Sequence, residues 1–341
     1  MSKPTLSKIA KTLGISVATV SKALKDYPDI SEKTKNDVKT VAKKLNYKPN
    51  SYAQSLRNQE SKIVGLIIPE IVHHFFANII LGVIKEAEKN GYLVITLQSD
   101  EKYEIEKNQI ELLLNKNVDG ILISLADNTV DYKHVKNIIE SGVPVVLYDK
   151  ISKLIDCSKV VIDDQKAAFN ATKHLIESGC KTIAHIRGPL KPQTTIDRFI
   201  GYKNALAHHN IPFDNNLVFE TKNLSFEDGK LIADEIYNNN KQIDGVFAMT
   251  DLLATGALVR FKELGINIPE DISIIGFSNW FLTKITTPKL STVNQPGFEM
   301  GKEAFKLLLR DIESLKQNSI SSFTTIEIPT EVIIRNSTLK N

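Results

Sequence analysis

The stretch LSKIAKTLGISVATVSKAL, residues 6–24, decides how the N-terminal part of this chain folds. Apolar residues recur at helical spacing up to Leu13, Gly14 follows where a helix can end in a left-handed conformation, and Ser16 is placed to cap a second helix. The stretch therefore predicts two short helices joined by a tight turn.

The second of these helices has two distinct faces. Its apolar stripe is Val20, Ala23 and Leu24, and a separate face at its N-terminal end consists of Val17, Ala18, Ser21 and Lys22. Such a helix suits a groove of DNA, but a helical hairpin whose small residues allow close packing has the same pattern. The flanking sequence has to separate the two interpretations.

A third helix is predicted to begin after Ser31, which can cap it. Its inward face would consist of Thr34, Val38, Val41, Ala42 and Leu45. Pro49 then blocks helix continuation, and Asn50 can cap a short helix over residues 51–56. The composition of this last segment, taken alone, favours a polar linker over a functional hinge.

The positive charge of the chain is concentrated in these N-terminal residues. Residues 1–60 hold eleven lysines and one arginine against five acidic residues, a surplus of seven positive charges, so the remainder must carry −4 to give the total of +3. A basic module on a mildly acidic body suggests a polyanionic partner, and the helix pattern favours DNA. At 341 residues, 42% of them hydrophobic, the chain can form two or three globular domains.

The sequence contains no signal for export and no predicted membrane span. The N-terminus has no apolar segment followed by a cleavage site, and no stretch approaches the length of a membrane span. Cys157 and Cys180 are too few for a disulfide framework or a metal site, so we expect idle, buried thiols. We therefore expect a cytoplasmic protein with no metal ion and no cofactor.

From Ile63 onward, short apolar runs alternate with amphipathic segments of helical length, which predicts parallel sheets covered by helices on both faces. The runs are IVGLII (63–68), YLVITL (92–97), GILISL (120–125), VPVVLY (143–148), TIAHI (182–186), GVFA (245–248) and ISIIG (272–276). VDGILISLAD (118–127) resembles IDGVFAMTDL (243–252), so two similar lobes are expected. STVNQP (291–296) and SFTTIEIPTEVII (322–334) are expected to cross back between them as a hinge.

Ligands of open parallel sheets bind beyond the carboxyl ends of the strands, so the residues that follow the apolar runs are the candidates. They mix aromatic, hydroxyl, carboxylate and guanidinium groups, among them Asp149, Arg198 and Trp280. This mixture suits a polyhydroxylated ligand, and a nucleobase or another small polar metabolite fits nearly as well. Asp164 and Asp251 are expected to act only as helix caps.

The same loops contain no recognised catalytic motif, since GxGxxG after a strand, GxxxxGK[ST], GxSxG and HExxH are all missing from the sequence. In the adjacent pairs His73–His74 and His208–His209, successive side chains point in different directions. We expect structural or pocket-rim roles for these histidines rather than metal binding, and we expect no enzyme.

Several segments spread over the chain carry a resemblance to a known family: IAKTLGISVATVSKAL (9–24), ISEKTKNDVKTVAKKLNYKPN (30–50), YAQSLR (52–57), PEIVHHFFANIILGVIKEAEKNGY (69–92), NVDGILI (117–123), HLIESGCKTIAHIRGP (174–189), DRFIGYKNAL (197–206), PEDISIIGFSN (269–279) and IPTEVIIRNST (328–338). Over essentially its full length, the chain resembles the LacI/GalR family of bacterial transcriptional regulators. The resemblance implies an all-α N-terminal helix-turn-helix domain followed by an α/β two-lobed effector domain with the type I periplasmic-binding-protein-like fold.

The implied domains are a DNA-binding domain over residues 1–48, a hinge helix and linker over 49–61, and an effector-binding and dimerisation domain over 62–341. Within the last, the N-lobe is expected over about 62–161 plus 292–322 and the C-lobe over about 162–291 plus 323–338. The implied function is that of a homodimeric regulator, expected to repress, that binds a pseudo-palindromic operator in double-stranded DNA. A small metabolite, a sugar or sugar derivative, would control it; the alternative is a sugar-binding protein without a DNA role.

Carried over to this sequence, the base-reading positions of the family fall on Val17, Ala18 and Lys22. Many relatives have arginine where Lys22 stands, and a lysine cannot reproduce the bidentate fork, so weaker or altered discrimination at that base is expected. Leu56 matches the hinge leucine that wedges into the minor groove. The positions that resemble contacts to the DNA backbone are Ser16, Thr19, Ser21, Thr34, Tyr47 and Asn50.

The implied effector-binding residues are His74, Phe75, Asp149, Arg198, Thr250, Ser278 and Gln295. Two pairs depart from the family pattern: Thr250–Asp251 stands where many relatives have Asn-Asp, and Ser278–Asn279 where many have Asp-Asp. The missing carboxylate at Ser278 removes a strong acceptor for ligand hydroxyls. An ordinary family sugar is therefore not assumed, and a sugar acid or another anion becomes a hypothesis.

Overall fold

The computed structural model describes residues 4–47, 60–238, 242–317 and 322–339. It divides into two compact units, residues 1–61 and 62–341, which are described one at a time. The expected hinge residues Asn50 and Leu56 lie outside the described residues, so their roles stay predictions from the sequence.

The described part of the first unit contains the three predicted helices, α1 (Leu6–Leu13), α2 (Val17–Ala23) and α3 (Glu32–Lys44). Gly14 ends α1 in the left-handed conformation, at φ 65°. The hydroxyls of Ser16 and Ser31 cap α2 and α3 by accepting N–H groups of the first turn at 3.0 Å and 3.2 Å. The predicted helix starts and stops are therefore confirmed.

All three helices contribute to one small core. Its buried residues are Ile9, Ala10, Val20, Ala23, Val38 and Ala42. This core contains the predicted stripe residues Val20 and Ala23 of α2, which leaves the other face of that helix out of the packing. A core of this size supplies only a few kcal/mol of stability, about 3–5 at most.

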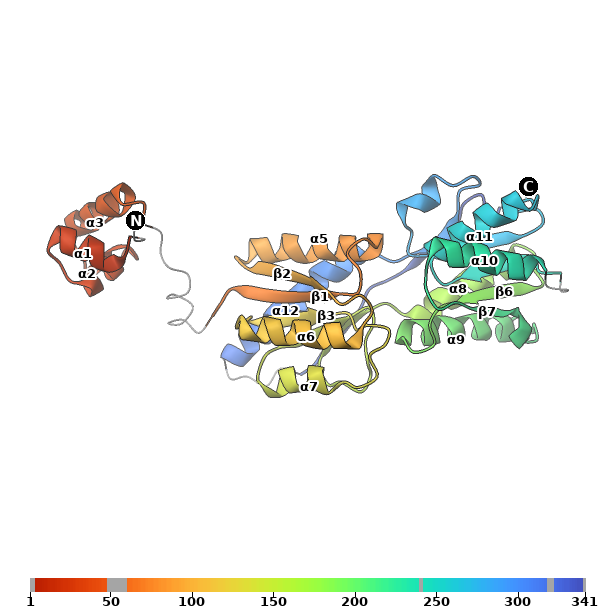
Figure 1. The fold of residues 1–341 in the computed structure, drawn as a ribbon, viewed down its shortest axis with the longest axis horizontal. Coiled ribbons are helices and arrows are strands. Elements are labelled where there is room, and N and C mark those ends of the chain that lie inside the picture. The colour runs from red at the N-terminus through yellow and green to blue at the C-terminus, as the bar shows by residue number, and fades with distance from the viewer. Residues whose placement is uncertain (1–3, 48–59, 239–241, 318–321, 340–341) are drawn as a thin grey trace. The chain divides into compact units, whose positions relative to one another are not determined.

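The second unit contains two six-stranded sheets in its described residues, one in each lobe (Figure 1). The first sheet has the order β11-β5-β4-β3-β1-β2, and every neighbouring pair is parallel. Its strands are β1 (Ile63–Ile68), β2 (Leu93–Gln98), β3 (Gly120–Ile123), β4 (Val145–Tyr148), β5 (Ser158–Val161) and β11 (Thr325–Glu327).

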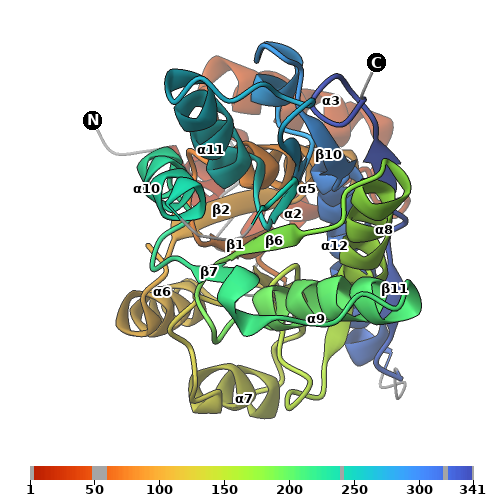
Figure 2. The same ribbon diagram turned by 90° about the vertical axis from the view of Figure 1, so that its right-hand side faces the viewer.

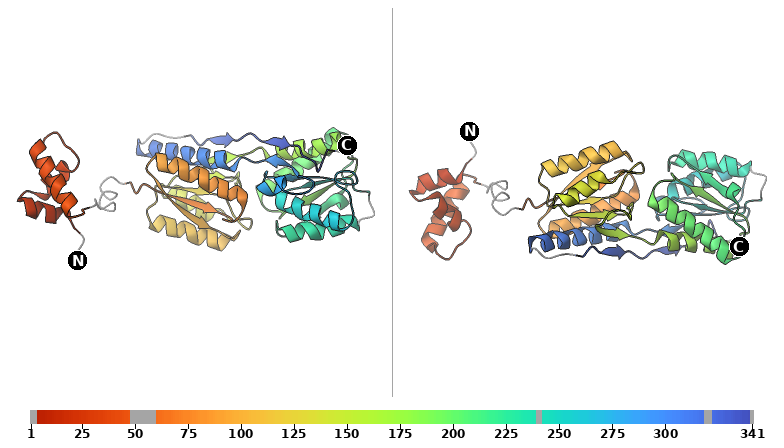
Figure 3. Two further views of the ribbon diagram at one scale, coloured as in Figure 1. Left: turned by 90° about the horizontal axis from the view of Figure 1, so that it is seen from above. Right: turned by 90° about the horizontal axis from the view of Figure 1, so that it is seen from below.

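Helices cover both faces of the first sheet, as the apolar runs predict (Figure 3). They are α5 (His74–Lys89), α6 (Tyr103–Asn115), α7 (Lys133–Glu140) and α12 (Gly297–Lys316). Leu66 and Ile68 of β1 pack in one cluster with residues of α5 and α12, whereas Ile67 packs in another with residues of α6 and α7. Alternate residues of a buried strand thus enter opposite cores, which is why β1 is apolar throughout.

The second sheet has the order β12-β10-β9-β8-β6-β7, with β12 antiparallel to β10. Its strands are β6 (Ile183–Arg187), β7 (Val218–Glu220), β8 (Gly245–Ala248), β9 (Ser273–Phe277), β10 (Ser291–Asn294) and β12 (Glu331–Ile333). The helices α8 (Asp164–Glu177) and α9 (Gln193–His208) cover one face, and α10 (Phe226–Tyr237) and α11 (Asp251–Glu263) cover the other (Figure 2). Two 3-10 turns, η1 (Asn215–Leu217) and η2 (Phe281–Lys284), complete the lobe.

The predicted similarity of the lobes is visible in the strand order. β3 lies between β4 and β1, and β8 occupies the same place between β9 and β6. The aspartate before each strand makes the same kind of contact: Asp119 accepts the N–H of Lys62 at 3.0 Å, and Asp244 accepts the N–H of Thr182 at 2.8 Å. Each carboxylate thereby fixes the start of the neighbouring strand, β1 or β6.

The expected division of the C-terminal segment between the lobes was wrong in two places. Residues 292–294 were placed in the N-lobe, but β10 pairs with β9 in the second sheet. Residues 325–327 were placed in the C-lobe, but β11 pairs with β5 in the first sheet. Both sheets offer an edge with free hydrogen-bonding groups, so the apolar pattern of a short strand does not tell which edge it joins.

The described helices include none that is long and apolar enough to span a lipid bilayer. Cys157 and Cys180 are both buried free thiols, as expected. Burial raises the pKa of Cys157 to about 11, which leaves it a poor nucleophile at neutral pH.

Candidate functional site

The face of α2 that was predicted to read DNA is exposed. Val17 keeps 43% of its surface accessible, and Ala18 and Lys22 are exposed too, whereas Val20 and Ala23 are fully buried. Among the predicted backbone contacts, Ser16 is exposed and the others that are described, Thr19, Ser21, Thr34 and Tyr47, are half-buried. The face is therefore open to a partner, while its base-reading and backbone-contacting roles stay predictions.

One residue at this face was not anticipated. The ammonium of Lys22 lies 2.5 Å from Oδ2 of Asp29, which is in the loop between α2 and α3. The hydrogen bond raises the pKa of Lys22 and lowers the pKa of Asp29. A separation of seven residues across a turn is outside the helical spacings from which ion pairs are predicted, so this pair could not be predicted from the sequence.

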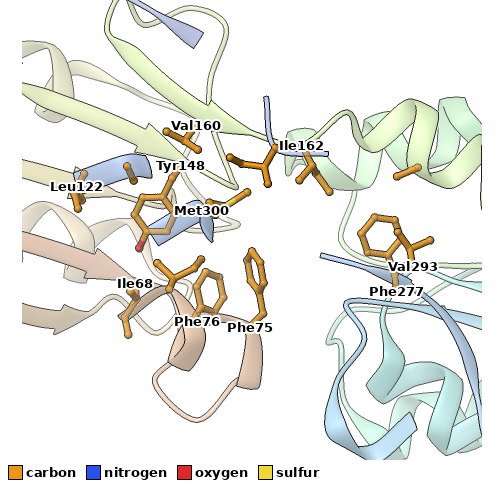
Figure 4. Close-up of a cluster of buried hydrophobic side chains, with 14 of the residues drawn as sticks. Ile68, Phe75, Phe76, Leu122, Tyr148, Val160, Ile162, Phe277, Val293 and Met300 are labelled. Atoms are coloured by element: carbon orange, nitrogen blue, oxygen red, sulfur yellow. The ribbon is translucent and has the colours of Figure 1, made fainter. Parts of the chain in front are cut away.

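In the second unit, residues of the two lobes face each other beyond the carboxyl ends of the strands, with Phe75 and Phe76 on one side and Phe277 and Val293 on the other (Figure 4). Phe75, at the start of α5 in the first lobe, belongs to the same buried cluster as Phe277 and Val293 of the second lobe. A pocket is lined from both sides as well, by Asp127, Thr129 and Lys150 of the first lobe and by Gln193 of the second. This is where the general rule for parallel sheets places a ligand.

A hydrogen-bonded chain connects three of the predicted effector residues across the lobes. The amide Nε2 of Gln295 donates to Oδ1 of Asp149 at 2.9 Å, and Ser278 Oγ donates to Gln295 Oε1 at 3.2 Å. Burial raises the pKa of Asp149, and the charges of Arg198 and Lys150 and the Gln295 hydrogen bond oppose that rise. Asp149 and Gln295 are both buried.

Arg198 is held from three sides and is only 4% exposed. Its Nε donates to Oδ1 of Asp164 at 2.7 Å, its Nη1 donates to the carbonyl of Met249 at 2.8 Å, and its guanidinium lies 3.6 Å from the centre of the Phe277 ring. Burial raises the pKa of Asp164 to about 6 in spite of the arginine. A guanidinium fixed in this way can present its remaining N–H groups to a ligand with little loss of entropy.

Four aromatic rings form a second contact between the lobes. The indole of Trp280 lies 6.2 Å from the ring of His74, nearly parallel to it, and 5.8 Å from the ring of His73. Phe281 meets His74 edge-on at 6.2 Å. Burial, assisted by the charges of Lys150, His74 and Arg198, lowers the pKa of His73 to about 4, so this imidazole is neutral at pH 7. These ring contacts give both histidines a structural role between the lobes, which is one of the two roles expected for them, and the pocket-rim role stays a prediction.

Thr250 is the predicted effector residue with the least connection to the others. Its hydroxyl accepts the N–H of Leu253 at 3.3 Å and caps α11. Asp251, which was expected to be a cap only, instead accepts from Thr292 Oγ1 at 2.5 Å and from the N–H of Trp280 at 2.7 Å. The capping prediction was wrong because the residue one position earlier, with extended backbone, occupies the N-cap.

The capping role expected for Asp164 was wrong for the same reason. Asp163 is the N-cap of α8 and accepts the N–H of Lys166 at 2.9 Å. Asp164 is thereby left free to pair with Arg198. A run of two aspartates before a helix does not reveal which one is the cap.

Lys150 completes the charged groups of the site. Its Nζ lies 2.5 Å from carboxylate oxygens of both Glu101 and Asp127. Burial raises the pKa of Glu101 to about 7, with Lys150 opposing the rise and Asp127 adding to it. Asp149, Asp164 and Asp251 are the other carboxyl groups at the strand ends, where Arg198, Arg335 and the pocket-lining Lys191 join Lys150 as cations.

Backbone strain is concentrated at these strand ends. Five non-glycine residues with positive φ follow β2, β4 and β9: Asp100 (51°), Glu101 (56°), Asp149 (55°), Ser278 (112°) and Asn279 (53°). Such conformations cost of order 1–3 kcal/mol each, persist only where the surroundings enforce them, and cluster at binding sites. They turn Asp149 and Ser278 toward Gln295, which neither strand would do by continuing straight.

Across the ranges that the structure describes, no group of three or more His, Cys, Asp or Glu side chains is arranged to hold a metal ion. The carboxylates of the site are instead paired with Lys150, Arg198, Gln295 or Thr292. Aromatic faces, a fixed guanidinium and buried hydrogen-bonding side chains make this site suited to binding a small polar molecule.

Comparison with known proteins agrees with this division into two units. Residues 61–336 match the family model described as "Periplasmic binding proteins and sugar binding domain of LacI family", and residues 5–50 match "Bacterial regulatory proteins, lacI family". The chain is 32% identical to the HTH-type transcriptional repressor PurR of Vibrio atlanticus, over 91% of this chain and 92% of that protein. It is 31% identical to the ribose operon repressor of Halalkalibacterium halodurans, over 98% and 97%.

Solved structures show the same similarity. The transcription regulator CcpA of Lactococcus lactis aligns with a TM-score of 0.73 and 35% identity, over 81% of this chain and 99% of that one. The transcriptional regulator CelR in complex with cellobiose aligns with a TM-score of 0.75 and 27% identity, over 98% and 99%. These relatives are regulators of transcription, and this chain belongs to the LacI family of bacterial regulatory proteins.

Proposed function

We propose that this protein is a repressor whose affinity for an operator is controlled by a neutral, polyhydroxylated small molecule bound between the two lobes. The observation that carries the proposal is the interlobe site, where Asp149, Ser278 and Gln295 are hydrogen-bonded in a chain. His74 and Arg198 also belong to this site. His74 stacks against the ring of Trp280, and the guanidinium of Arg198 lies over the ring of Phe277.

The DNA-binding part of the proposal rests on the exposed face of α2. Val17 and Ala18 would contact thymine methyl groups, and Lys22 would donate to guanine acceptors in the major groove. Ser16, Thr19, Ser21, Thr34, Tyr47 and Asn50 would contact the DNA backbone and fix the register. Leu56 would enter the minor groove of the operator centre, with one half-site per subunit of a homodimer.

The charges of the site favour a neutral ligand over an acidic one. The cations Lys150 and Arg198 are already paired with carboxylates. A ligand carboxylate that bound either cation would have to displace one of these partners, which costs free energy in a partly buried site. Ligand hydroxyls, in contrast, can donate to Asp149 and accept from Arg198.

Relatives support a carbohydrate. One solved neighbour is a complex with cellobiose, and one curated relative is a ribose operon repressor. At 27–31% identity to these proteins, we propose the carbohydrate class and not an individual sugar.

Ligand control requires different affinities of the ligand for two arrangements of the lobes. Gln295 lies in the crossing between β10 and α12 and contacts one residue of each lobe, Asp149 and Ser278. A ligand hydroxyl that took the place of either partner would change the contacts that hold the lobes together. That is the differential interaction by which binding would bias operator affinity.

Thermal denaturation of the full-length protein in the presence of neutral sugars, amino sugars and sugar acids tests the ligand class. A ligand at 100 times its Kd stabilises the protein by about 2.7 kcal/mol, which is readily detected. Arg198→Met should abolish the shift. Arg260→Met is the matched control, because Arg260 makes a comparable 2.7 Å contact with Asp234 away from the site. Stabilisation by sugar acids and not by neutral sugars would refute the neutral-ligand proposal.

A gel-shift experiment with duplexes selected from a random pool tests the DNA role. We expect a two-fold symmetric motif and a change of its affinity on adding the ligand found in the thermal screen. Ligand binding without any selected DNA motif would instead favour a sugar-binding protein without a DNA role.

A further inference from the structure

We propose that Asp29 is a positioning residue that orients the ammonium of Lys22 for recognition of guanine. The inference rests on the proposed function, since it assumes that Lys22 reads a base. A lysine lacks the fixed fork by which arginine recognises guanine, and Asp29 would compensate for this.

The ammonium of Lys22 and the carboxylate of Asp29 are in direct contact. Nζ of Lys22 lies 2.5 Å from Oδ2 of Asp29, on the exposed side of the α2–α3 loop. Lys22 is one turn beyond Ala18 on α2, on the face that also carries Val17. The carboxylate therefore holds the end of a long, flexible side chain at the surface that would enter the major groove.

Asp29 is itself held in place by short-range contacts of the backbone. The N–H of Tyr27 donates to the carbonyl of Lys22 at 3.2 Å, and the N–H of Ile30 donates to the carbonyl of Tyr27 at 3.3 Å. Ile30 packs against the core of the unit, and Ser31 caps α3. These contacts fix the path of the loop relative to α2, so the carboxylate is a fixed acceptor rather than a mobile one.

The donor geometry of an ammonium group explains what this acceptor provides. An ammonium carries three N–H donors that rotate freely about the Cε–Nζ bond. When one of these N–H groups donates to Asp29, the ammonium no longer rotates freely, and its other two N–H groups point in defined directions. Guanine presents two acceptors side by side in the major groove, O6 and N7, and no other base presents this pair. The two remaining donors can match them, as the fork of an arginine does.

The pair also reduces the entropy lost on binding. A free lysine side chain loses rotamer entropy when it is immobilised, and a side chain already held in place has lost part of this entropy before DNA binds. As an exposed ion pair, Lys22–Asp29 adds little to the stability of the unit, so stability alone does not account for it.

The same unit supplies a matched control. Lys39 and Asp26 form a second ion pair at 2.5 Å, with side chains 49% and 59% exposed against 48% and 51% for Lys22 and Asp29. Asp26→Asn and Asp29→Asn remove the same charge from the same loop. Both should raise affinity for DNA of any sequence to a similar extent, because each removes one repulsion of the phosphates. Only Asp29→Asn should alter base preference.

The test is selection of binding sites from a random duplex pool by the full-length wild type, followed by competition binding on single-base variants of the selected site. Lys22→Ala identifies the base pair that Lys22 reads, by loss of a preference for guanine expected to be about 5- to 150-fold. At that base pair, Asp29→Asn should reduce the preference by about fivefold, the equivalent of one net hydrogen bond. Asp26→Asn should leave it unchanged.

A rescue variant separates positioning from a structural role. In Lys22→Arg the guanidinium brings its own fork, so adding Asp29→Asn should no longer reduce the preference for guanine. Equal effects of Asp29→Asn and Asp26→Asn on all base pairs would overturn the inference, as would an effect of Asp29→Asn confined to another base pair. If Lys22→Ala changes no preference, or if no motif is selected, the proposed base-reading role of Lys22 fails first, and the inference with it.

Discussion

Asp251→Asn tests whether the buried carboxyl behind the Trp280 loop is a source of pH dependence. Asp251 is 2% exposed and accepts hydrogen bonds from Thr292 Oγ1 and from the N–H of Trp280. Burial raises its pKa to about 7, although both hydrogen bonds and the charge of Arg335 oppose the rise. Asparagine keeps the shape and can still accept from Trp280, but it never ionises.

The magnitude and its sign follow from linkage. The pKa of Asp251 is higher in the folded protein than the unfolded value of about 3.9, so the contribution of this group to stability is greatest at low pH and is lost as the pH rises toward 7. A difference of about 3 units corresponds to about 4 kcal/mol in all. About 2–3 kcal/mol of this contribution to the free energy of unfolding is lost between pH 5 and pH 8. The wild type should lose that amount relative to Asp251→Asn over the interval.

Urea denaturation followed by tryptophan fluorescence measures this difference directly, because Trp280 is the only tryptophan in the sequence and its N–H is bonded to Asp251. We compare the unfolding free energy of the wild type and the variant at pH 5 and at pH 8. Asp156→Asn, at an exposed position of the first lobe, should give the same difference from wild type at both pH values. If Asp251→Asn does so too, the assignment of a raised pKa to Asp251 is refuted.

Three further predictions concern the crossings, the packing and the hinge. Gln295→Leu leaves the buried carboxyl of Asp149 without its amide donor, so at pH 8 it should lower the unfolding free energy by about 1–3 kcal/mol and weaken ligand binding; unchanged values of both would contradict the interlobe chain. Gly301→Ala places a Cβ 2.2 Å from the carbonyl oxygen of Ile79, so α5 and α12 must separate; we expect a loss of about 1–3 kcal/mol in urea denaturation, and an unchanged midpoint would show that the contact is not tight. Leu56→Ala should weaken operator binding by about tenfold with ligand affinity unchanged, and equal operator affinity in a titration would exclude the wedge role.

The parts of the fold that local sequence determines were predicted well. Gly14, Ser16 and Ser31 mark helix ends because capping depends on residues three or four positions apart. The seven apolar runs all fall on strands, β1 to β4, β6, β8 and β9, and all except the edge strand β2 are buried on both faces. Strands β5 and β7 are missing from that prediction, since SKVV and VFE are short and partly polar.

The site itself depends on contacts between residues that are far apart in the chain. Asp149 and Gln295 are separated by 146 positions, and the sequence around either residue does not predict that the two are in contact. The resemblance to a family supplied the positions but not their partners: the roles of Asp164 and Lys150 were found only when the folded chain brought these residues together with Arg198 and Asp127. Local sequence also does not tell which of two adjacent residues is the helix cap and which makes contacts in the site. This was the case for Asp163 and Asp164, and for Thr250 and Asp251.

The turn at Ser278 and Asn279 shows how the second lobe maintains a strained conformation at the site. The N–H of Ser278 donates to the carbonyl of Val293 at 2.8 Å, and that of Asn279 donates to Thr292 Oγ1 at 3.2 Å. Arg335 Nη2 donates to Asn279 Oδ1 at 2.7 Å, so β9, β10 and the C-terminal segment all hold the turn. Because these contacts lie within one lobe, the turn moves with β10 as a rigid body. Any rearrangement of the lobes must therefore take place in the crossings outside it, and the residues after Asn294, beginning with Gln295, are the ones whose contacts a ligand can change.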